Sequence, residues 1–192
     1  MRMILASASP RRKALLEQIG LRGFEIVPSG ADESEEVSLS PAETARRLAI
    51  RKGEAVRETQ GDDALILSAD TVVEAEGRIL GKPRDAEEAE RMLLTLSGRT
   101  HAVHTGVALF YGEKRASHVE SVRVTFRPLA LSEIKAYVAT GEPMDKAGAY
   151  GIQGGAAAFV SRVEGDYSAV VGLPLCRLSE LLGEFGVTLF DS

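Results

Sequence analysis

Apolar runs and amphipathic segments alternate from one end of this chain to the other. The largely apolar runs Met3–Ala6 and Ala64–Ala69 have the composition of strands that are covered on both faces. Between them, the segment that follows Ser40 repeats its apolar residues at helical spacing. That helical face consists of Ala45, Leu48, Ala49 and Val56. Because strand and helix patterns alternate, we expect an α/β protein.

The remaining elements follow the same rules. Strand patterns occur at 24–28, 101–111 and 117–127, and at 72–73 and 78–80, which Glu76-Gly77 joins into a predicted hairpin. Helical patterns occur at 13–19, after the capping residue Asp85, at 132–140 and around Leu178–Phe185. A glycine-rich stretch, 145–155, leads into a last strand. We find no repeat and no linker, so residues 1–192 are expected to form a single domain.

Composition narrows the classes of function. The chain has 192 residues and a net charge of −5, which argues against a general nucleic-acid surface. Cys176 is the only cysteine, which excludes an internal disulfide and a cysteine-based metal site. The three histidines lie in strand-like stretches without metal-ligand spacing, and we expect surface or sheet positions for them. No apolar run has the length of a membrane span, and no signal peptide is visible, so we predict a cytoplasmic protein without a membrane partner.

The segment Ser7-Ala8-Ser9-Pro10-Arg11-Arg12 joins the first strand to the first helix. A helix N-terminus presents free N–H groups and a positive dipole end, and here two guanidinium groups lie in the first turn. This combination suits phosphate oxygens. The alternative is a serine cap, Pro10 at the first helical position and two solvated arginines.

Asp70 follows a buried strand, and we expect it at the strand's end, where α/β sheets expose ligand-binding groups. A carboxylate there could hold Mg²⁺ or orient water, and Thr71 could hydrogen bond to a phosphate or a base. The alternative is an ordinary turn aspartate.

Several cations occupy unusual places. Lys52 lies on the apolar face of its helix, Lys82 lies in the turn Gly81-Lys82-Pro83, and Lys146 belongs to the glycine-rich stretch. Each has a plain alternative as a solvated side chain. Together with Asp70 and Glu33, these cations fit a metal-assisted phosphoryl site. Neither a Walker motif nor a dinucleotide fingerprint is present.

Six sequence motifs, in the same order along the chain, resemble those of the Maf family of nucleoside triphosphate pyrophosphatases over essentially the whole chain. The motifs are 7–12, Ala69–Val73, Gly81–Pro83, Ser97-Gly98 with His101 and Thr105-Gly106, Asp145–Gly154, and Gly172–Leu175. The resemblance implies an α/β fold related to inosine-triphosphate pyrophosphatases, with a long twisted mixed sheet flanked by helices and a central cleft between two lobes. A homodimer is compatible with it.

The resemblance also implies hydrolysis of a nucleoside triphosphate to the monophosphate and pyrophosphate with Mg²⁺ or Mn²⁺. Residues 70–71 and 146–153 point to the branch that acts on dTTP and UTP. By the same match Asp70 is the proton acceptor, and Arg11, Thr71 and Gln153 govern base choice. The residues linked to phosphate or metal are Ser7, Arg12, Glu33, Lys52, Lys82 and Lys146. Asp70 and Glu33 are the expected metal ligands.

Two other functions stay open at this stage. One is a nucleotide-binding regulator of cell division or septum formation, in which binding matters more than turnover. The other is a broader pool-sanitising pyrophosphatase for modified nucleotides. A water-activating carboxylate at Asp70 favours an enzyme over a pure sensor.

Overall fold

The computed structural model describes residues 1–31 and 39–190. Among them, seven strands form one mixed sheet in the order β2-β1-β3-β5-β6-β7, with β4 paired to β3. The strands are β1 (Arg2–Leu5), β2 (Glu25–Ile26), β3 (Ala64–Ala75), β4 (Arg78–Leu80), β5 (Thr100–Tyr111), β6 (Lys114–Phe126) and β7 (Val160–Glu164). β1 runs parallel to both of its neighbours, and every other pairing is antiparallel. The predicted α/β class with a mixed sheet is confirmed.

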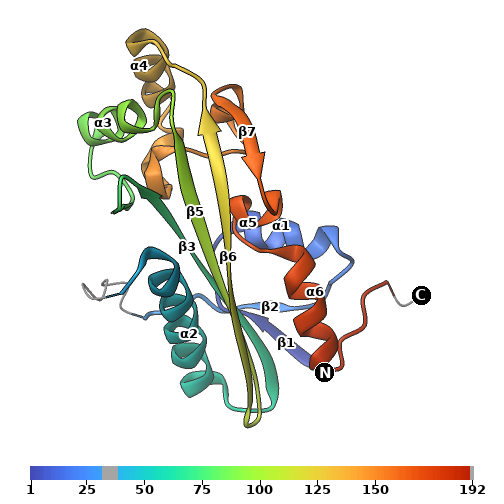
Figure 1. The fold of residues 1–192 in the computed structure, drawn as a ribbon. Helices are drawn as coiled ribbons and strands as arrows, with labels where there is room; N and C mark the ends of the chain where they lie inside the picture. The colour runs from blue at the N-terminus through green and yellow to red at the C-terminus, as the bar shows by residue number, and fades with distance from the viewer. Residues whose placement is uncertain (32–38, 191–192) are drawn as a thin grey trace.

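Helices flank this sheet along its length (Figure 1). They are α1 (Pro10–Gln18), α2 (Pro41–Gln60), α3 (Ala86–Leu96), α4 (Leu131–Ala139), α5 (Tyr167–Val171) and α6 (Leu175–Glu184), with 3₁₀ turns at Glu142–Asp145, Ala147–Ala149 and Gly155–Ala158. In Figure 1, α3 and α4 lie at the upper end of the long strands, and α2, β1 and α6 lie around their lower half. The long strands β3, β5 and β6 therefore connect two groups of elements.

Local capping places two of these helices where the sequence predicts them. The Ser40 side chain accepts a hydrogen bond from the Glu43 N–H, and the Asp85 side chain accepts one from the Glu88 N–H. The hairpin between β3 and β4 turns at Glu76 and Gly77, both of which have positive φ. The short helix α5 is not among the predicted elements, because its five residues carry too little periodic pattern.

One boundary in β3 differs from the prediction, and it matters for function. Asp70 does not end this strand but lies inside it, opposite Gly106 of β5, and the strand continues to Ala75. The reason is long-range pairing. β5 accompanies β3 from Ile66 to Glu74, which holds the polar pair at 70–71 in extended backbone.

The two faces of β3 carry different neighbours. Ser68 donates a hydrogen bond to the Ala49 carbonyl of α2, so the even-numbered residues, Asp70 included, face α2. α2 packs so closely on the sheet that a Cβ on Gly106 would overlap the backbone of Ala45. Leu67, Ala69 and Val73 belong to the main core on the other face. Adjacent residues 70 and 71 therefore point to opposite sides of one strand.

One edge of β3 is open in its middle. On that edge β1 pairs with residues 64–67 and β4 pairs with residues 73–75. Among the described strands, none pairs with residues 68–72 there. At this gap, side chains from both faces of β3 can border the same cleft.

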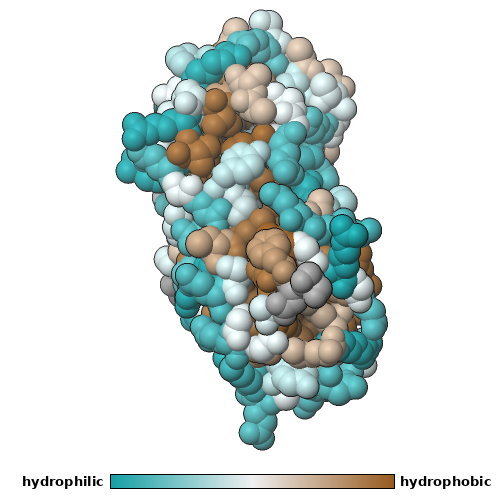
Figure 2. Space-filling view, turned by 90° about the vertical axis from the view of Figure 1, so that its right-hand side faces the viewer, coloured by the Kyte–Doolittle hydropathy of each residue, from teal (hydrophilic) through white to brown (hydrophobic). Residues whose placement is uncertain are grey.

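Within residues 1–31 and 39–190, no helix combines the length and the apolar character that are needed to cross a membrane. Seen from the side of α6 and the C-terminal segment, most of the surface is hydrophilic, and hydrophobic residues gather in separate groups (Figure 2). Among the exposed hydrophobic side chains of the described residues are Ile26, Tyr167 and Phe190.

Candidate active site

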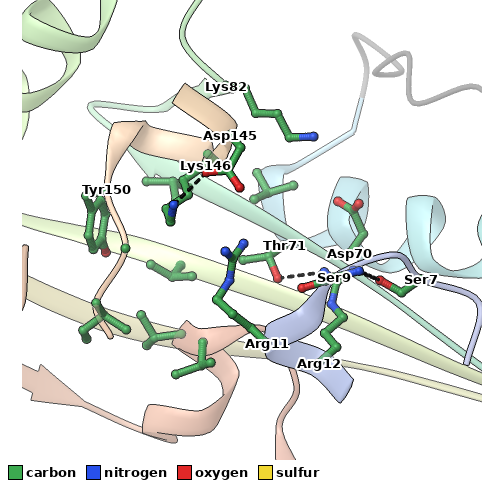
Figure 3. Close-up of a pocket in the computed structure, with 18 of the residues that line it drawn as sticks. Ser7, Ser9, Arg11, Arg12, Asp70, Thr71, Lys82, Asp145, Lys146 and Tyr150 are labelled. Carbon is green, nitrogen blue, oxygen red and sulfur yellow. Dashed lines mark hydrogen bonds and ion pairs between the residues drawn. The ribbon is translucent and has the colours of Figure 1, made fainter. Parts of the chain in front are cut away.

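A cleft of about 820 Å³ opens at the unpaired edge of β3. Nine of the predicted site residues line it: Ser7, Arg11, Arg12, Lys52, Asp70, Thr71, Lys82, Lys146 and Gln153. In Figure 3, Lys82, Asp145 and Lys146 lie on one side, and Ser7 and Arg12 lie on the other. Glu33, the remaining predicted residue, lies outside the described residues. The fold therefore gathers groups that are up to 146 positions apart in the chain, from Ser7 to Gln153.

Arg12 is anchored in the wall of the cleft. Its Nη1 donates to Ser7 Oγ at 3.1 Å, and its Nε donates to the Gly172 carbonyl at 3.0 Å. Ser7 Oγ also accepts from the Ser9 N–H at 3.2 Å, while Ser9 itself makes no side-chain cap. Ser9 is thus the residue at the N-cap position and Pro10 opens the helix, as the alternative has it, but Ser9 makes no side-chain capping hydrogen bond. The other part of that alternative, a solvated arginine, is wrong for Arg12.

A chain of hydroxyl groups continues from Arg12 across the sheet. Arg12 Nη2 donates to Thr71 Oγ1 at 3.3 Å, and Thr71 Oγ1 lies 3.0 Å from Thr105 Oγ1. Thr105 Oγ1 donates to the Ala169 carbonyl at 2.7 Å, and Thr105 is completely buried. Thr71 is thus held between a cation and a buried hydroxyl.

Asp70 and Lys52 form an ion pair on the α2 side of the strand. Lys52 Nζ lies 2.6 Å from Asp70 Oδ1, and the two side chains are only 11% and 13% exposed. α2 thus turns Lys52 into the cleft, which is one of the two positions that the sequence pattern left open, and Lys52 is not a solvated lysine. The pair holds the carboxylate in one orientation at the cleft wall.

The glycine-rich stretch forms the opposite wall. Lys146 Nζ donates to the Glu142 carbonyl and to Asp145 Oδ1, both at 2.6 Å. The hydrogen bond from Lys146 lowers the pKa of Asp145 below its ordinary value, with a smaller contribution from the charge of Arg11. Gly148 allows this wall to approach the sheet, because a Cβ there would lie 2.9 Å from Val73 Cγ1.

A bracket made by Tyr137 and Glu142 fixes the same stretch from behind. The Tyr137 hydroxyl donates to Glu142 Oε1 at 2.8 Å and accepts from the Gly151 N–H at 3.2 Å. Glu142 Oε2 accepts from the Gly155 N–H at 3.0 Å. Burial raises the pKa of Tyr137 well above its ordinary value, so its hydroxyl keeps the proton that it donates. Gln153 lies between the two backbone groups that the bracket holds.

Arg11, Lys82 and Gln153 line the cleft without a hydrogen-bond or ion-pair partner in residues 1–31 and 39–190. Lys82 and Gln153 are exposed at the rim, and Arg11 is half-buried. A donor-only guanidinium, an ammonium and an amide that are not bound to the protein can bind a ligand.

The donor set fits a divalent metal that is shared with a phosphorylated ligand. Within the described residues, no group of three or more His, Cys, Asp or Glu could hold an ion. Mg²⁺ is typically bound through one or two carboxylates together with phosphate oxygens and water. Asp70 supplies one such carboxylate in the cleft.

Sequence reasoning missed two residues around this site, Tyr137 and Glu142, and it named Thr105 only as part of the Thr105-Gly106 motif, without a role. Only strand register places Thr105 beside Thr71, and only helix packing brings Tyr137 and Glu142 to the cleft wall. His101 does lie in a strand, as predicted, but it is buried and lies 2.7 Å from the Tyr150 hydroxyl through its Nε2. Its burial lowers the pKa of His101 to about 4.

Comparison with known proteins agrees with this architecture. A dTTP/UTP pyrophosphatase of Moorella thermoacetica is 53% identical over 191 residues, which are 98% of this chain and 97% of that protein. A dTTP/UTP pyrophosphatase of Symbiobacterium thermophilum is 52% identical over 189 residues, 98% of this chain and 96% of that protein. A HAM1 protein from Coxiella burnetii has a similar fold, with a TM-score of 0.50 at 17% identity over 96% of this chain and 99% of that one.

The family model described as Maf-like protein matches residues 2–185, which contain every element of the sheet and all the described cleft residues. Since this match and the relatives above extend over nearly the whole length, the chain belongs to the Maf-like protein family.

Proposed function

We propose that this protein hydrolyses dTTP and UTP to the nucleoside monophosphate and pyrophosphate. The observation that carries the proposal is the meeting of Asp70 with cationic side chains from both walls in one cleft at the edge of β3. Two relatives, 53% and 52% identical to this chain, carry the name dTTP/UTP pyrophosphatase, and this supports the same substrates here.

The two faces of β3 suggest how a nucleotide lies. Thr71, Val73 and Val103 share the face beneath the glycine-rich wall, and all three line the cleft. An apolar floor with a hydroxyl suits the flat ring of a base. Arg11 and Gln153 supply donors and an acceptor around that ring. The base therefore lies on this side of the strand.

The triphosphate lies toward the other face, near the N-terminus of α1. Ser7 and Lys52 line that part of the cleft, and Arg12 lies between Ser7 and Thr71, hydrogen bonded to both. Lys82 and Lys146 face it from the opposite wall. Fixed cations next to a helix N-terminus stabilise the charge that develops on the leaving pyrophosphate. Their main contribution is made in the transition state.

Asp70 accepts a proton from the attacking water. The water oxygen forms a bond to the α-phosphorus while the bond from that phosphorus to the α–β bridging oxygen breaks, and pyrophosphate leaves with the electron pair. Lys52 keeps the carboxylate pointed at the cleft through the 2.6 Å ion pair. Asp70, together with Glu33 as the sequence resemblance implies, would hold a Mg²⁺ or Mn²⁺ ion, which supplies charge neutralisation of the phosphates.

The test is a panel of ribo- and deoxyribonucleoside triphosphates in H₂¹⁸O, with Mg²⁺, with Mn²⁺ and after chelation. We expect monophosphate and pyrophosphate as products, fastest for dTTP and UTP, with one ¹⁸O atom in the monophosphate. Chelation should abolish turnover, and added Mg²⁺ or Mn²⁺ should restore it.

The products show which bond is cleaved and which phosphorus the water attacks. A diphosphate with inorganic phosphate as the main products would refute α–β cleavage. Label in the pyrophosphate would place the attack on the β-phosphorus. Tight nucleotide binding without turnover under any metal would favour the regulatory alternative over the enzyme.

A further inference from the structure

The hydrogen-bond chain that ends on Ala169 determines what Thr71 can offer to a ligand. A hydroxyl group has one hydrogen to donate, and a carbonyl oxygen can only accept. Thr105 Oγ1 lies 2.7 Å from the Ala169 carbonyl, so the Thr105 hydrogen is used there. The 3.0 Å contact between the two threonine hydroxyls must then use the hydrogen of Thr71.

The contact between Arg12 and Thr71 also has a fixed direction of donation. Arg12 carries only donors, and its Nη2 donates to Thr71 Oγ1 at 3.3 Å. The order of donation is therefore Arg12 to Thr71, Thr71 to Thr105, and Thr105 to the Ala169 carbonyl. Thr71 has no hydrogen left for the cleft, but one lone pair of its oxygen is still available there.

We infer that Thr105 is a positioning residue that makes Thr71 a hydrogen-bond acceptor toward the base, so that the cleft favours a base with a ring N–H over one with a bare ring nitrogen. Uracil and thymine carry a hydrogen on N3, whereas cytosine presents an unprotonated N3. This inference rests on the proposed function, and it predicts a preference for dTTP and UTP over the cytosine nucleotides.

Because Thr105 is buried, water does not compete for its hydrogen bonds, and the order of donation is fixed. Thr105 is 0% exposed, and Ala169, whose carbonyl accepts its hydrogen, is 1% exposed. Reversing the chain would leave a buried carbonyl without that donor, which is costly. The acceptor state of Thr71 is thus maintained by groups that never touch the substrate.

Thr71 lies at the surface of the cleft, where a base can approach it. Thr71 is half-buried in the cleft lining, and Gly172 lies beside it with no side chain. A Cβ on Gly172 would lie 3.4 Å from Arg12 Nε and 3.9 Å from Thr71 Oγ1. Arg12 and Thr71 both lie at the cleft (Figure 3), so the lone pair of Thr71 that Arg12 does not use is the one that a base can reach.

The first part of the test compares kcat/KM for UTP and CTP in the wild type, Thr105→Val and Thr105→Ser. The wild type should favour UTP by about 10-fold or more, as expected when a mismatched pair leaves polar groups unsatisfied. Thr105→Val frees the Thr71 hydrogen to donate to cytosine N3, and the UTP to CTP ratio should fall by about 5-fold or more. Thr105→Ser keeps the hydroxyl and should keep the ratio within about 2-fold of the wild type.

The ratio separates positioning from mere stability, because a loosened fold lowers both rates together. A Thr105→Val protein that is folded by its thermal melt but keeps the wild-type ratio would overturn the inference, as would a wild type that hydrolyses CTP as well as UTP. If the wild type releases no pyrophosphate from UTP, the proposed function itself fails, which is a different result.

A second measurement needs no variant. N3-methyl-UTP retains both carbonyl groups of uracil but lacks the N3–H, so the wild type should hydrolyse it at least about 10-fold less efficiently than UTP. Equal hydrolysis of the two nucleotides would refute the inference even if Thr105→Val did not fold.

Discussion

The bracket behind the glycine-rich wall can be broken by one methyl group. Gly154 has φ −103°, so Gly154→Ala does not place a side chain in the left-handed region. Its new Cβ would overlap Glu142 Oε1, however, and the Glu142 carboxylate must move away. That movement breaks its hydrogen bonds from the Tyr137 hydroxyl and the Gly155 N–H.

The size of the effect follows from those two contacts. Hydrogen bonds to a charged group contribute about 1.5–3 kcal/mol each when buried, but Glu142 is half-exposed and water replaces part of them. We therefore expect Gly154→Ala to lower the free energy of unfolding by about 2 kcal/mol. In a protein of this length that corresponds to a Tm lower by about 4–8 °C. Since Gln153 precedes the altered residue, kcat/KM for UTP should fall by about 10-fold.

The assay is thermal unfolding and UTP hydrolysis of Gly154→Ala, Glu142→Ala and the double variant. Gly183→Ala is the matched control, because its Cβ meets nothing within 4 Å and it lies in α6. The control should be neutral or more stable by about 0.5–1 kcal/mol.

The double-mutant cycle decides whether the reasoning holds. Once Glu142 is removed, the added methyl group has no carboxylate to displace, so Gly154→Ala should then cost less than about 0.5 kcal/mol. An equal cost in both backgrounds would show that the methyl group acts elsewhere, and a Gly154→Ala protein of wild-type Tm would refute the overlap itself.

Three other predictions test separate parts of the molecule. Asp70→Asn should lower kcat by about 10²–10⁴-fold, while circular dichroism reports an unchanged fold; near-normal turnover would exclude Asp70 as the base. Burial lowers the pKa of His101 from 6.5 to about 4, so the unfolded chain takes up the proton first, and stability present above pH 6.5 is lost as pH falls toward 4. The loss between pH 7 and pH 5 should be about 2 kcal/mol, and His101→Gln should flatten this slope in thermal melts; an unchanged slope contradicts the assignment. Gly106→Ala should destabilise by about 3 kcal/mol or more because the methyl group meets the Ala45 backbone; a wild-type Tm would show that α2 can shift freely.

Local patterns in the sequence were sufficient for most of the fold. The caps at Ser40 and Asp85 and the hairpin turn at Glu76-Gly77 depend on residues within four positions of one another, and all are found where the patterns predict them. The apolar runs likewise identify the strands, because burial requires a continuous apolar segment whatever its partner.

The resemblance to a known family also identified the cleft residues, although not their surroundings. Asp70 was expected at a strand end, and its real place in the middle of β3 depends on pairing with residues more than 30 positions away. Lys52 was ambiguous between a solvated side chain and a site residue until the packing of α2 paired it with Asp70.

The sequence by itself determined which segments form helices and strands and which polar residues could meet phosphate, since both depend on residue type and short spacing. Only the tertiary structure decided which hydrogen each hydroxyl donates and what supports the cleft walls. Thr71 and Thr105 become neighbours through strand register, and Tyr137 and Glu142 reach Gly151 and Gly155 through packing. A hydrogen bond requires atoms at about 3 Å, and no pattern along the chain specifies that distance for residues that lie far apart in sequence.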